Sequence, residues 1–180
     1  MSIKKLFAAG IRRIVWSFCW FLPVQPNKVI ASSYYGKGYG DNPKYIVNEL
    51  LNDSNNFKII WVISDLEYKQ SLPEGIVPCL KDYIKYIYHL TTAKFWIDNC
   101  RKPVFYKKKK QFYIQTWHGD IGLKKGEKDV EKHLGKAYIK TAKKDSKNIN
   151  LITSSARWFT ETTRRNFWYD GEIMECGYPR

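Results

Sequence analysis

The stretch KVIASSYYGKGYGDNPKYIVNELL (residues 28–51) carries the pattern that decides the fold. Its first eight residues are rich in apolar and small side chains and predict a buried strand. The glycine-rich turn GKGYGD then leads into NPKYIVNELL, in which apolar residues recur at helical spacing. We expect Asp41 or Asn42 to cap this helix and Pro43 to lie in its first turn. The stretch therefore predicts a strand, a tight turn and a helix in succession.

The same alternation continues to the end of the chain. Further strands are predicted at FKIIWVIS (57–64), IVPCL (76–80), KFWIDN (94–99), QFYIQTW (111–117), residues 150–153 and GEIMECG (171–177). Helices are predicted at residues 81–93, at the lysine-rich residues 127–147 and at residues 155–168. Short apolar strands that alternate with helices are typical of an α/β fold. We therefore expect one Rossmann-like domain over residues 27–180, with a mostly parallel sheet and helices on both faces.

The N-terminal segment, residues 1–26, predicts an amphipathic helix. Its apolar run from Ile14 to Leu22 is about half of the roughly 20 residues that a membrane span needs. One face of the helical wheel is apolar and basic side chains flank it. The apolar residues are Leu6, Phe7, Ile11, Ile14, Val15, Phe18 and Leu22, and the basic ones are Lys4, Lys5, Arg12 and Arg13. This pattern is typical of a helix in a membrane interface; the alternative is a helix packed on the domain's own core.

Charge and cysteine content restrict the partners. The chain has 180 residues and a formal net charge of +14. Such a charge favours an anionic membrane surface, phosphate-rich substrates or nucleic acid. No RNP, KH or zinc-finger signature is present, so we expect no nucleic-acid partner. KKKK (residues 107–110) predicts a solvated hairpin tip or a contact with an anionic surface. The four cysteines are far apart, which predicts unpaired thiols, a reducing compartment and no metal site.

Two turns that follow predicted strands contain groups that could bind or react. GKGYGDNP places three glycines and a lysine before a helix, where backbone amides could hold a phosphate. Its spacing matches neither GxxxxGK[ST] nor GxGxxG, and the alternative is a tight turn that needs positive φ. The second turn lies in QTWHGDIGLKK (residues 115–125). Ligands of parallel sheets bind at the carboxyl ends of strands, so we expect the two turns to share one edge.

His118 is the candidate for chemistry in the second turn. A histidine at a strand end can accept a proton from a hydroxyl group at neutral pH. Lys124 and Lys125, six and seven residues further on, could steady phosphate oxygens. The alternative is a histidine with a structural role.

Five motifs, in order along residues 28–180, resemble those of the teichoic-acid glycerophosphotransferases, which use CDP-glycerol. They are SYYGKGYGDNPKYI, WVISD, AKFWIDN, QTWHGDIGLKK and GYPR. QTWHG followed by LKK is the most specific, although Asp120 and Ile121 stand where the family usually has threonine and proline. The resemblance implies the N-terminal domain of a GT-B fold, in which the active site lies between two Rossmann-type domains.

The resemblance also implies roles for individual residues. His118 matches the histidine thought to be the family's catalytic base. The residues expected to bind substrate or phosphate are Gly36, Lys37, Gly38, Gly40, Asp41, Asn42, Trp117, Gly119, Lys124 and Lys125. No metal ligand is expected, and no cofactor beyond the donor substrate CDP-glycerol.

The activity that the resemblance implies is transfer of glycerol phosphate from CDP-glycerol to a lipid-linked glycerophosphate acceptor. Such an acceptor places the protein peripherally, at the cytoplasmic face of the cell membrane. In this family GYPR usually leads into a donor-binding domain, so the chain corresponds to the acceptor-side half. A separately encoded C-terminal domain is then an expected partner. The alternative is a non-catalytic remnant of a split transferase that binds a membrane surface or an anionic polymer.

Overall fold

The sheet is parallel throughout. The computed structural model describes residues 3–81, 84–102, 107–119 and 126–180, with side chains from residue 10 onward. These residues form a seven-stranded sheet in the order β3-β2-β1-β4-β5-β6-β7, and each adjacent pair is parallel. The strands are β1 (Gln25–Ser32), β2 (Lys58–Ile63), β3 (Ile76–Leu80), β4 (Ala93–Asp98), β5 (Phe112–Gln115), β6 (Leu151–Ser154) and β7 (Glu172–Glu175). The predicted α/β fold with a mostly parallel sheet is confirmed.

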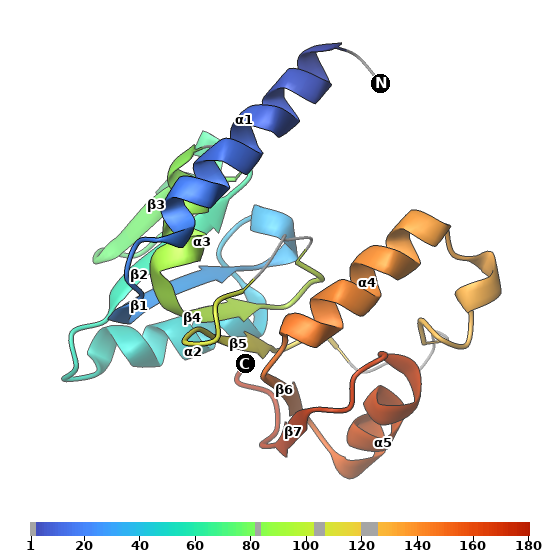
Figure 1. Cartoon of the computed structure of the whole chain (residues 1–180). Coiled ribbons are helices and arrows are strands. Elements are labelled where there is room, and N and C mark those ends of the chain that lie inside the picture. Colours follow the sequence, from blue (N-terminus) through green and yellow to red (C-terminus); the bar gives the residue numbers. More distant parts are fainter. Residues whose placement is uncertain (1–2, 82–83, 103–106, 120–125) are drawn as a thin grey trace.

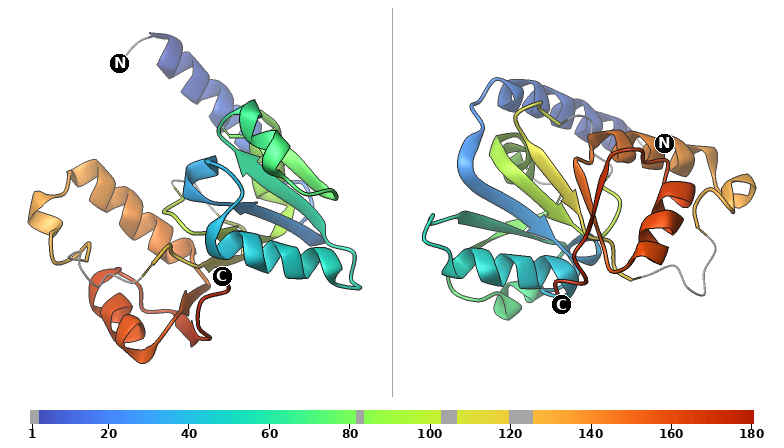
Figure 2. Two further views of the ribbon diagram at one scale, coloured as in Figure 1. Left: turned by 180° about the vertical axis from the view of Figure 1, so that it is seen from behind. Right: turned by 90° about the horizontal axis from the view of Figure 1, so that it is seen from below.

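Helices cover both faces of this sheet. They are α1 (Ile3–Trp20), α2 (Asp41–Asn52), α3 (Ile84–Thr92), α4 (Lys136–Asn148) and α5 (Arg157–Asn166), with short 3-10 helices η1 (Tyr34–Gly36), η2 (Leu66–Ser71) and η3 (Glu131–His133). Figure 1 labels the main elements, and the right-hand view of Figure 2 shows α1 and α2 on opposite sides of the strands. Consecutive strand residues point to opposite faces, so Ile30 packs in the core beneath α3 and Val29 packs toward α2.

Two predictions about where helices begin are wrong, and tertiary contacts explain both. The helix predicted at residues 127–147 begins only at Lys136, after the extended residue Gly135, and residues 127–134 form turns and η3. Glu127 instead forms an ion pair with the buried side chain of Arg101. Gly40, rather than Asp41 or Asn42, precedes the first residue of α2 as its N-cap. The side chains of Asp41 and Asn42 bind groups on other elements instead.

Helix α1 shows features of both alternatives raised by its sequence. Its C-terminal half packs against the core through Trp16 and Cys19, which are 8% and 9% exposed. Its apolar face nevertheless lies open, with Ile14 59% and Phe18 75% exposed. Leu6, Phe7, Lys4 and Lys5 lie outside the side chains that the structure describes. Among the described residues, no helix has the length and apolar character to cross a bilayer.

The KKKK segment anchors α1 rather than forming only a solvated tip. Lys108 Nζ donates to the main-chain oxygen of Cys19 at 3.3 Å and of Leu22 at 2.7 Å. Carbonyl groups at the C-terminus of a helix lack intrahelical partners, and a cation there also complements the helix dipole. Lys109 and Lys110 are exposed and therefore solvated, as predicted, but the predicted hairpin is wrong, because the flanking strands β4 and β5 pair in parallel.

Strand β1 contains a lysine with no solvent exposure. Lys28 Nζ donates to Thr92 Oγ1 at 2.6 Å and lies 4.3 Å from the ring centroid of Tyr88. Burial, with a smaller contribution from the charge of Lys58, lowers the pKa of Lys28 from 10.5 to about 8. Because burial disfavours the charged form, the ammonium group at neutral pH reduces the stability of the fold.

We predict that the Lys28→Met variant gains stability relative to the parent protein at pH 7 and that this gain shrinks as the pH rises. Above a pH of about 8, the folded parent chain releases the Lys28 proton while the unfolded chain still holds it. Stability of the parent therefore rises with pH in this window. Urea unfolding at pH 7 and pH 9.5 measures the difference, with Lys69→Met as a surface control. A difference between variant and parent that does not change with pH contradicts the prediction.

Candidate functional site

The two predicted turns meet at the carboxyl edge of the sheet. β4 lies between β1 and β5, so the segments that follow these three strands are neighbours. Asn42 Nδ2 donates to the carbonyl oxygen of Trp117 at 3.3 Å, and the ring centroids of Tyr34 and His118 are 5.9 Å apart. The expectation that the two turns share one edge is therefore confirmed.

The imidazole of His118 is held at one nitrogen. Its Nδ1 lies 2.6 Å from the main-chain oxygen of Asn99, the residue that follows β4. A carbonyl oxygen only accepts hydrogen bonds, so Nδ1 carries the proton in the neutral ring. The lone pair then resides on Nε2, and the side chain is exposed. The arrangement leaves His118 able to accept a proton from a group that approaches Nε2.

Trp117 supports the His118 ring from the side. The two rings stack with centroids 4.6 Å apart and an interplanar angle of 25°. The indole is itself held by an edge contact with Phe167, at 4.6 Å between centroids. Trp117 has a φ of 53° and Gly119 a φ of 140°, so His118 lies between two residues with positive φ. Such backbone at a non-glycine residue is costly and clusters at functional sites.

The glycine-rich turn uses part of its backbone internally. The amides of Gly36 and Lys37 both donate to the carbonyl oxygen of Ser33, at 2.8 and 3.1 Å. Gly36 has a φ of 93°, and a Cβ there would lie 2.7 Å from the amide nitrogen of Ser64. Glycine is therefore required at position 36 by a close backbone approach. This favours the tight-turn interpretation at Gly36, while phosphate binding by Lys37, Gly38 and Gly40 stays a prediction.

Other predicted site residues fall into two groups. The side chains of Asp41 and Asn42 are buried and do not face outward: Asp41 accepts from Asn99, and Asn42 donates to the main-chain oxygen of Trp117. Lys124 and Lys125, together with Asp120 and Ile121, lie outside the described residues.

Sequence reasoning assigned no role to Asn99, although it stands at the end of the AKFWIDN motif. Asn99 has no solvent exposure and provides the carbonyl oxygen that binds His118. A polar residue directly after a buried strand was the available signal. Every residue type has a main-chain oxygen, so the contact between His118 and Asn99 cannot be predicted from the sequence. It follows from the order of the strands in the sheet.

The thiol of Cys100, which lies near the site, is not activated. Cys100 Sγ lies 3.9 Å from His118 Nδ1. Burial, with a smaller contribution from Asp98, raises the pKa of Cys100 to about 12, so its thiol is protonated at neutral pH. All four cysteines are free, and the described part of the chain contains no group of three or more residues that could hold a metal ion.

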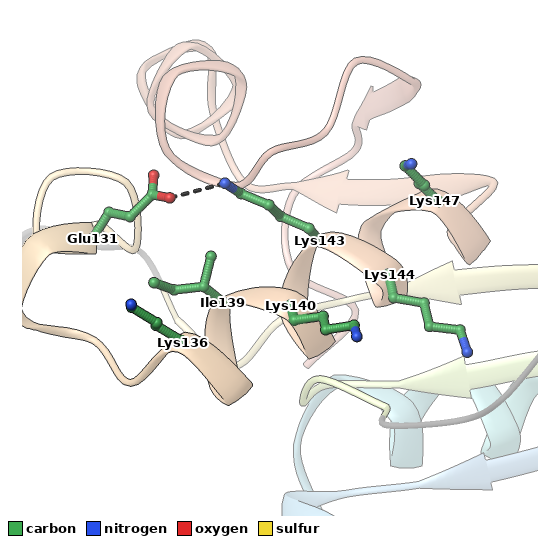
Figure 3. A pocket seen from close by; sticks show the side chains of 7 residues that line it. All are labelled: Glu131, Lys136, Ile139, Lys140, Lys143, Lys144 and Lys147. Atoms are coloured by element: carbon green, nitrogen blue, oxygen red, sulfur yellow. Dashed lines mark hydrogen bonds and ion pairs between the residues drawn. The ribbon is translucent and has the colours of Figure 1, made fainter.

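A basic groove lies along the exposed face of α4. It has a volume of about 580 Å³ and is shown in Figure 3. Its lining residues are Glu131, Lys136, Ile139, Lys140, Lys143, Lys144 and Lys147. Glu131 forms an ion pair with Lys143 at 2.8 Å. Lys136, Lys140 and Lys147 are exposed at spacings that place them on one helix face, where they create a positive surface.

Known proteins share both the sequence pattern and the fold. The chain is 32% identical over 164 residues to a teichoic acid poly(glycerol phosphate) polymerase of Staphylococcus epidermidis, covering 87% of this chain and 22% of that protein. It is 31% identical over 189 residues to a teichoic acid glycerol-phosphate transferase of Staphylococcus aureus, covering 99% of this chain and 47% of that one. The chain thus spans about half the length, or less, of these relatives.

Solved structures of a wall teichoic acid polymerase, TagF, have the same fold. One variant superposes with a TM-score of 0.82 at 25% identity, over 99% of this chain and 48% of that one. Another, from a crystal soaked with CDPG, gives a TM-score of 0.82 at 26% identity, over 97% of this chain and 47% of that one. Residues 14–180 match the family model described as CDP-glycerol:poly(glycerophosphate) glycerophosphotransferase. The chain belongs to this glycerophosphotransferase family.

Proposed function

We propose that this chain supplies the acceptor side of a glycerophosphotransferase. The reaction is transfer of glycerol phosphate from CDP-glycerol to a lipid-linked glycerophosphate acceptor in teichoic acid synthesis. The observation that carries the proposal is the geometry of His118, whose Nδ1–H binds the Asn99 oxygen and whose Nε2 keeps its lone pair. Family membership and the polymerase and transferase relatives support the substrate class.

In the proposed mechanism, His118 acts as the general base. Nε2 accepts the proton of the terminal hydroxyl of the acceptor as that oxygen forms a bond to the β-phosphorus of the donor. The bond from this phosphorus to the bridging oxygen breaks, and CMP leaves with the electron pair. Phosphoryl transfer depends mainly on positioning and charge stabilisation, which fits a site where one ring is held by stacking and by a hydrogen bond.

Donor binding is proposed to involve a C-terminal domain like that of the longer relatives. The chain corresponds to about half of the transferase from Staphylococcus aureus and of the TagF structures. In a GT-B arrangement the carboxyl edge that contains His118 faces the second domain. If no such domain is present in the cell, the non-catalytic alternative, a module that binds an anionic surface or polymer, takes its place.

Replacing the proposed base tests the function directly. With a donor-binding domain supplied, His118→Ala is expected to reduce kcat by a factor of about 10² to 10⁴, because the attacking hydroxyl loses its proton acceptor. Acceptor binding is expected to stay nearly unchanged. Turnover and melting temperature are measured on the same preparation. A structural role for His118 would instead lower the melting temperature and leave turnover per folded molecule unaltered.

The groove on α4 is proposed to attract the phosphate-rich acceptor. Changing Lys136, Lys140 and Lys147 together to Gln is expected to raise KM for a soluble oligo(glycerol phosphate) acceptor and to leave kcat unchanged. The effect should fade as salt is added, because exposed charges are screened over about 8 Å at physiological ionic strength. The matched control changes Lys44, Lys58 and Lys69 to Gln, which removes the same charge elsewhere. If both triple variants raised KM equally, the net charge of the protein would explain the effect, and the groove on α4 would have no specific role.

The exposed face of α1 is proposed to lie in the interface of an anionic membrane. Ile14→Ser combined with Phe18→Ser should weaken binding to vesicles of anionic lipid without lowering the melting temperature, since both side chains are mostly exposed. Trp16→Ala is the contrasting variant, because Trp16 is buried and its loss should destabilise the fold. Vesicle co-sedimentation and thermal melting measure the two effects. Full vesicle binding by the double serine variant would contradict the interfacial role.

A further inference from the structure

A buried carboxylate lies next to the His118 site. The side chain of Asp41 is 2% exposed. Its Oδ2 accepts hydrogen bonds from Asn99 Nδ2 at 2.7 Å and from Tyr34 Oη at 3.0 Å. Its Oδ1 accepts from Arg180 Nη1 at 2.9 Å. The charge is therefore compensated by three donors, as burial of a carboxylate requires.

Asn99 connects this carboxylate to the imidazole. Its side-chain amide donates to Asp41, its Oδ1 accepts from the main-chain amide of Tyr34 at 2.8 Å, and its main-chain oxygen binds His118 Nδ1. Every polar group of the Asn99 side chain is thus engaged by the glycine-rich turn or by Asp41. The position of the oxygen that selects the His118 tautomer is consequently fixed by residues 34 and 41.

The backbone around Asp41 is held in an unfavourable conformation. Asp41 has a φ of 56° and Tyr34 a φ of 46°, although neither is a glycine. Such conformations persist only where surrounding interactions determine them. Asp41 is also the first residue of α2, where an acidic side chain often serves the helix itself. Here its contacts go to Asn99, Tyr34 and Arg180 instead.

We propose that Asp41 and Asn99 are positioning residues for His118, with Arg180 of the GYPR motif as a third member of the network. They hold the Asn99 carbonyl where it keeps the His118 proton on Nδ1 and leaves Nε2 free to accept the substrate proton. This inference rests on the proposed function of His118. It also gives roles to residues that were expected only to bind phosphate or to carry the resemblance to a family.

The tautomer of His118 is the direct readout. In the ¹⁵N-labelled 180-residue chain at about pH 8.5, where an ordinary imidazole is neutral, the ring nitrogens report which one carries the proton. His118→Gln identifies the signals, because the chain has three histidines. We expect Nδ1–H to dominate in the parent protein. Asp41→Asn leaves one oxygen to serve three donors and should increase the Nε2–H fraction.

Two further variants keep the inference testable if the Asp41→Asn protein does not fold. Asn99→Ala should give the largest change in tautomer but removes a fully buried side chain. Arg180→Gln changes an arginine that is 41% exposed, should leave the fold intact, and should shift the tautomer in the same direction by less. The matched control is Asn48→Ala, which removes the Tyr39–Asn48 hydrogen bond of 2.7 Å on the same helix. It should not alter the His118 tautomer.

Kinetics complete the test. With a donor-binding domain supplied, Asp41→Asn should lower kcat by about 10- to 100-fold, as expected for a displaced reacting group, with KM for the acceptor nearly unchanged. Folded Asp41→Asn and Arg180→Gln proteins that keep the parent tautomer overturn the inference, as does a shifted tautomer with unchanged kcat. Full turnover by His118→Ala would overturn the proposed base instead, whatever the tautomer spectra show.

Discussion

The parallel pairing of β1, β4 and β5 is the constraint on which the rest of the site depends. In a parallel sheet all carboxyl ends lie at one edge, so three turns from distant parts of the sequence become neighbours. Because β4 lies in the middle, Asn99 stands between the glycine-rich turn and the WHG turn. One asparagine can therefore bind the first turn with its side chain and the second with its main chain.

The two faces of the sheet serve different purposes. The face beneath α2 is closed by aliphatic side chains and by Trp61, whose indole also donates to the Gly38 carbonyl at 3.1 Å and so supports the glycine-rich turn. The face beneath α3 continues into α1, which is held by Trp16 and by Lys108. This anchoring lets α1 present Ile14 and Phe18 outward without loss of the core. A firmly attached helix with an exposed apolar face suits an enzyme proposed to act on a lipid-linked acceptor.

Two networks of buried polar groups lie close to the proposed base, His118. Asn99 donates a hydrogen bond to Asp41, and both belong to a network in which each buried donor has an acceptor. Arg101 likewise binds Glu127, Ser146 and the carbonyl of Phe167, and its guanidinium group lies 5.8 Å from the centroid of the Trp117 ring. Because Phe167 also contacts Trp117, this second network supports the indole on which the imidazole stacks. Two buried polar networks thus border His118, the proposed base.

The sequence by itself determined the alternation of strands and helices, the parallel sheet and the WHG turn with His118, because apolar periodicity and turn residues are local properties. It also indicated that the two turns share an edge, since topology follows from that alternation. The start of α4 and the capping of α2 were decided by tertiary structure, because Glu127 and Asp41 bind partners far away in the sequence. The tautomer of His118 was also decided by tertiary structure. It depends on a main-chain oxygen of Asn99, and every residue type has such an oxygen, so no sequence pattern could identify it.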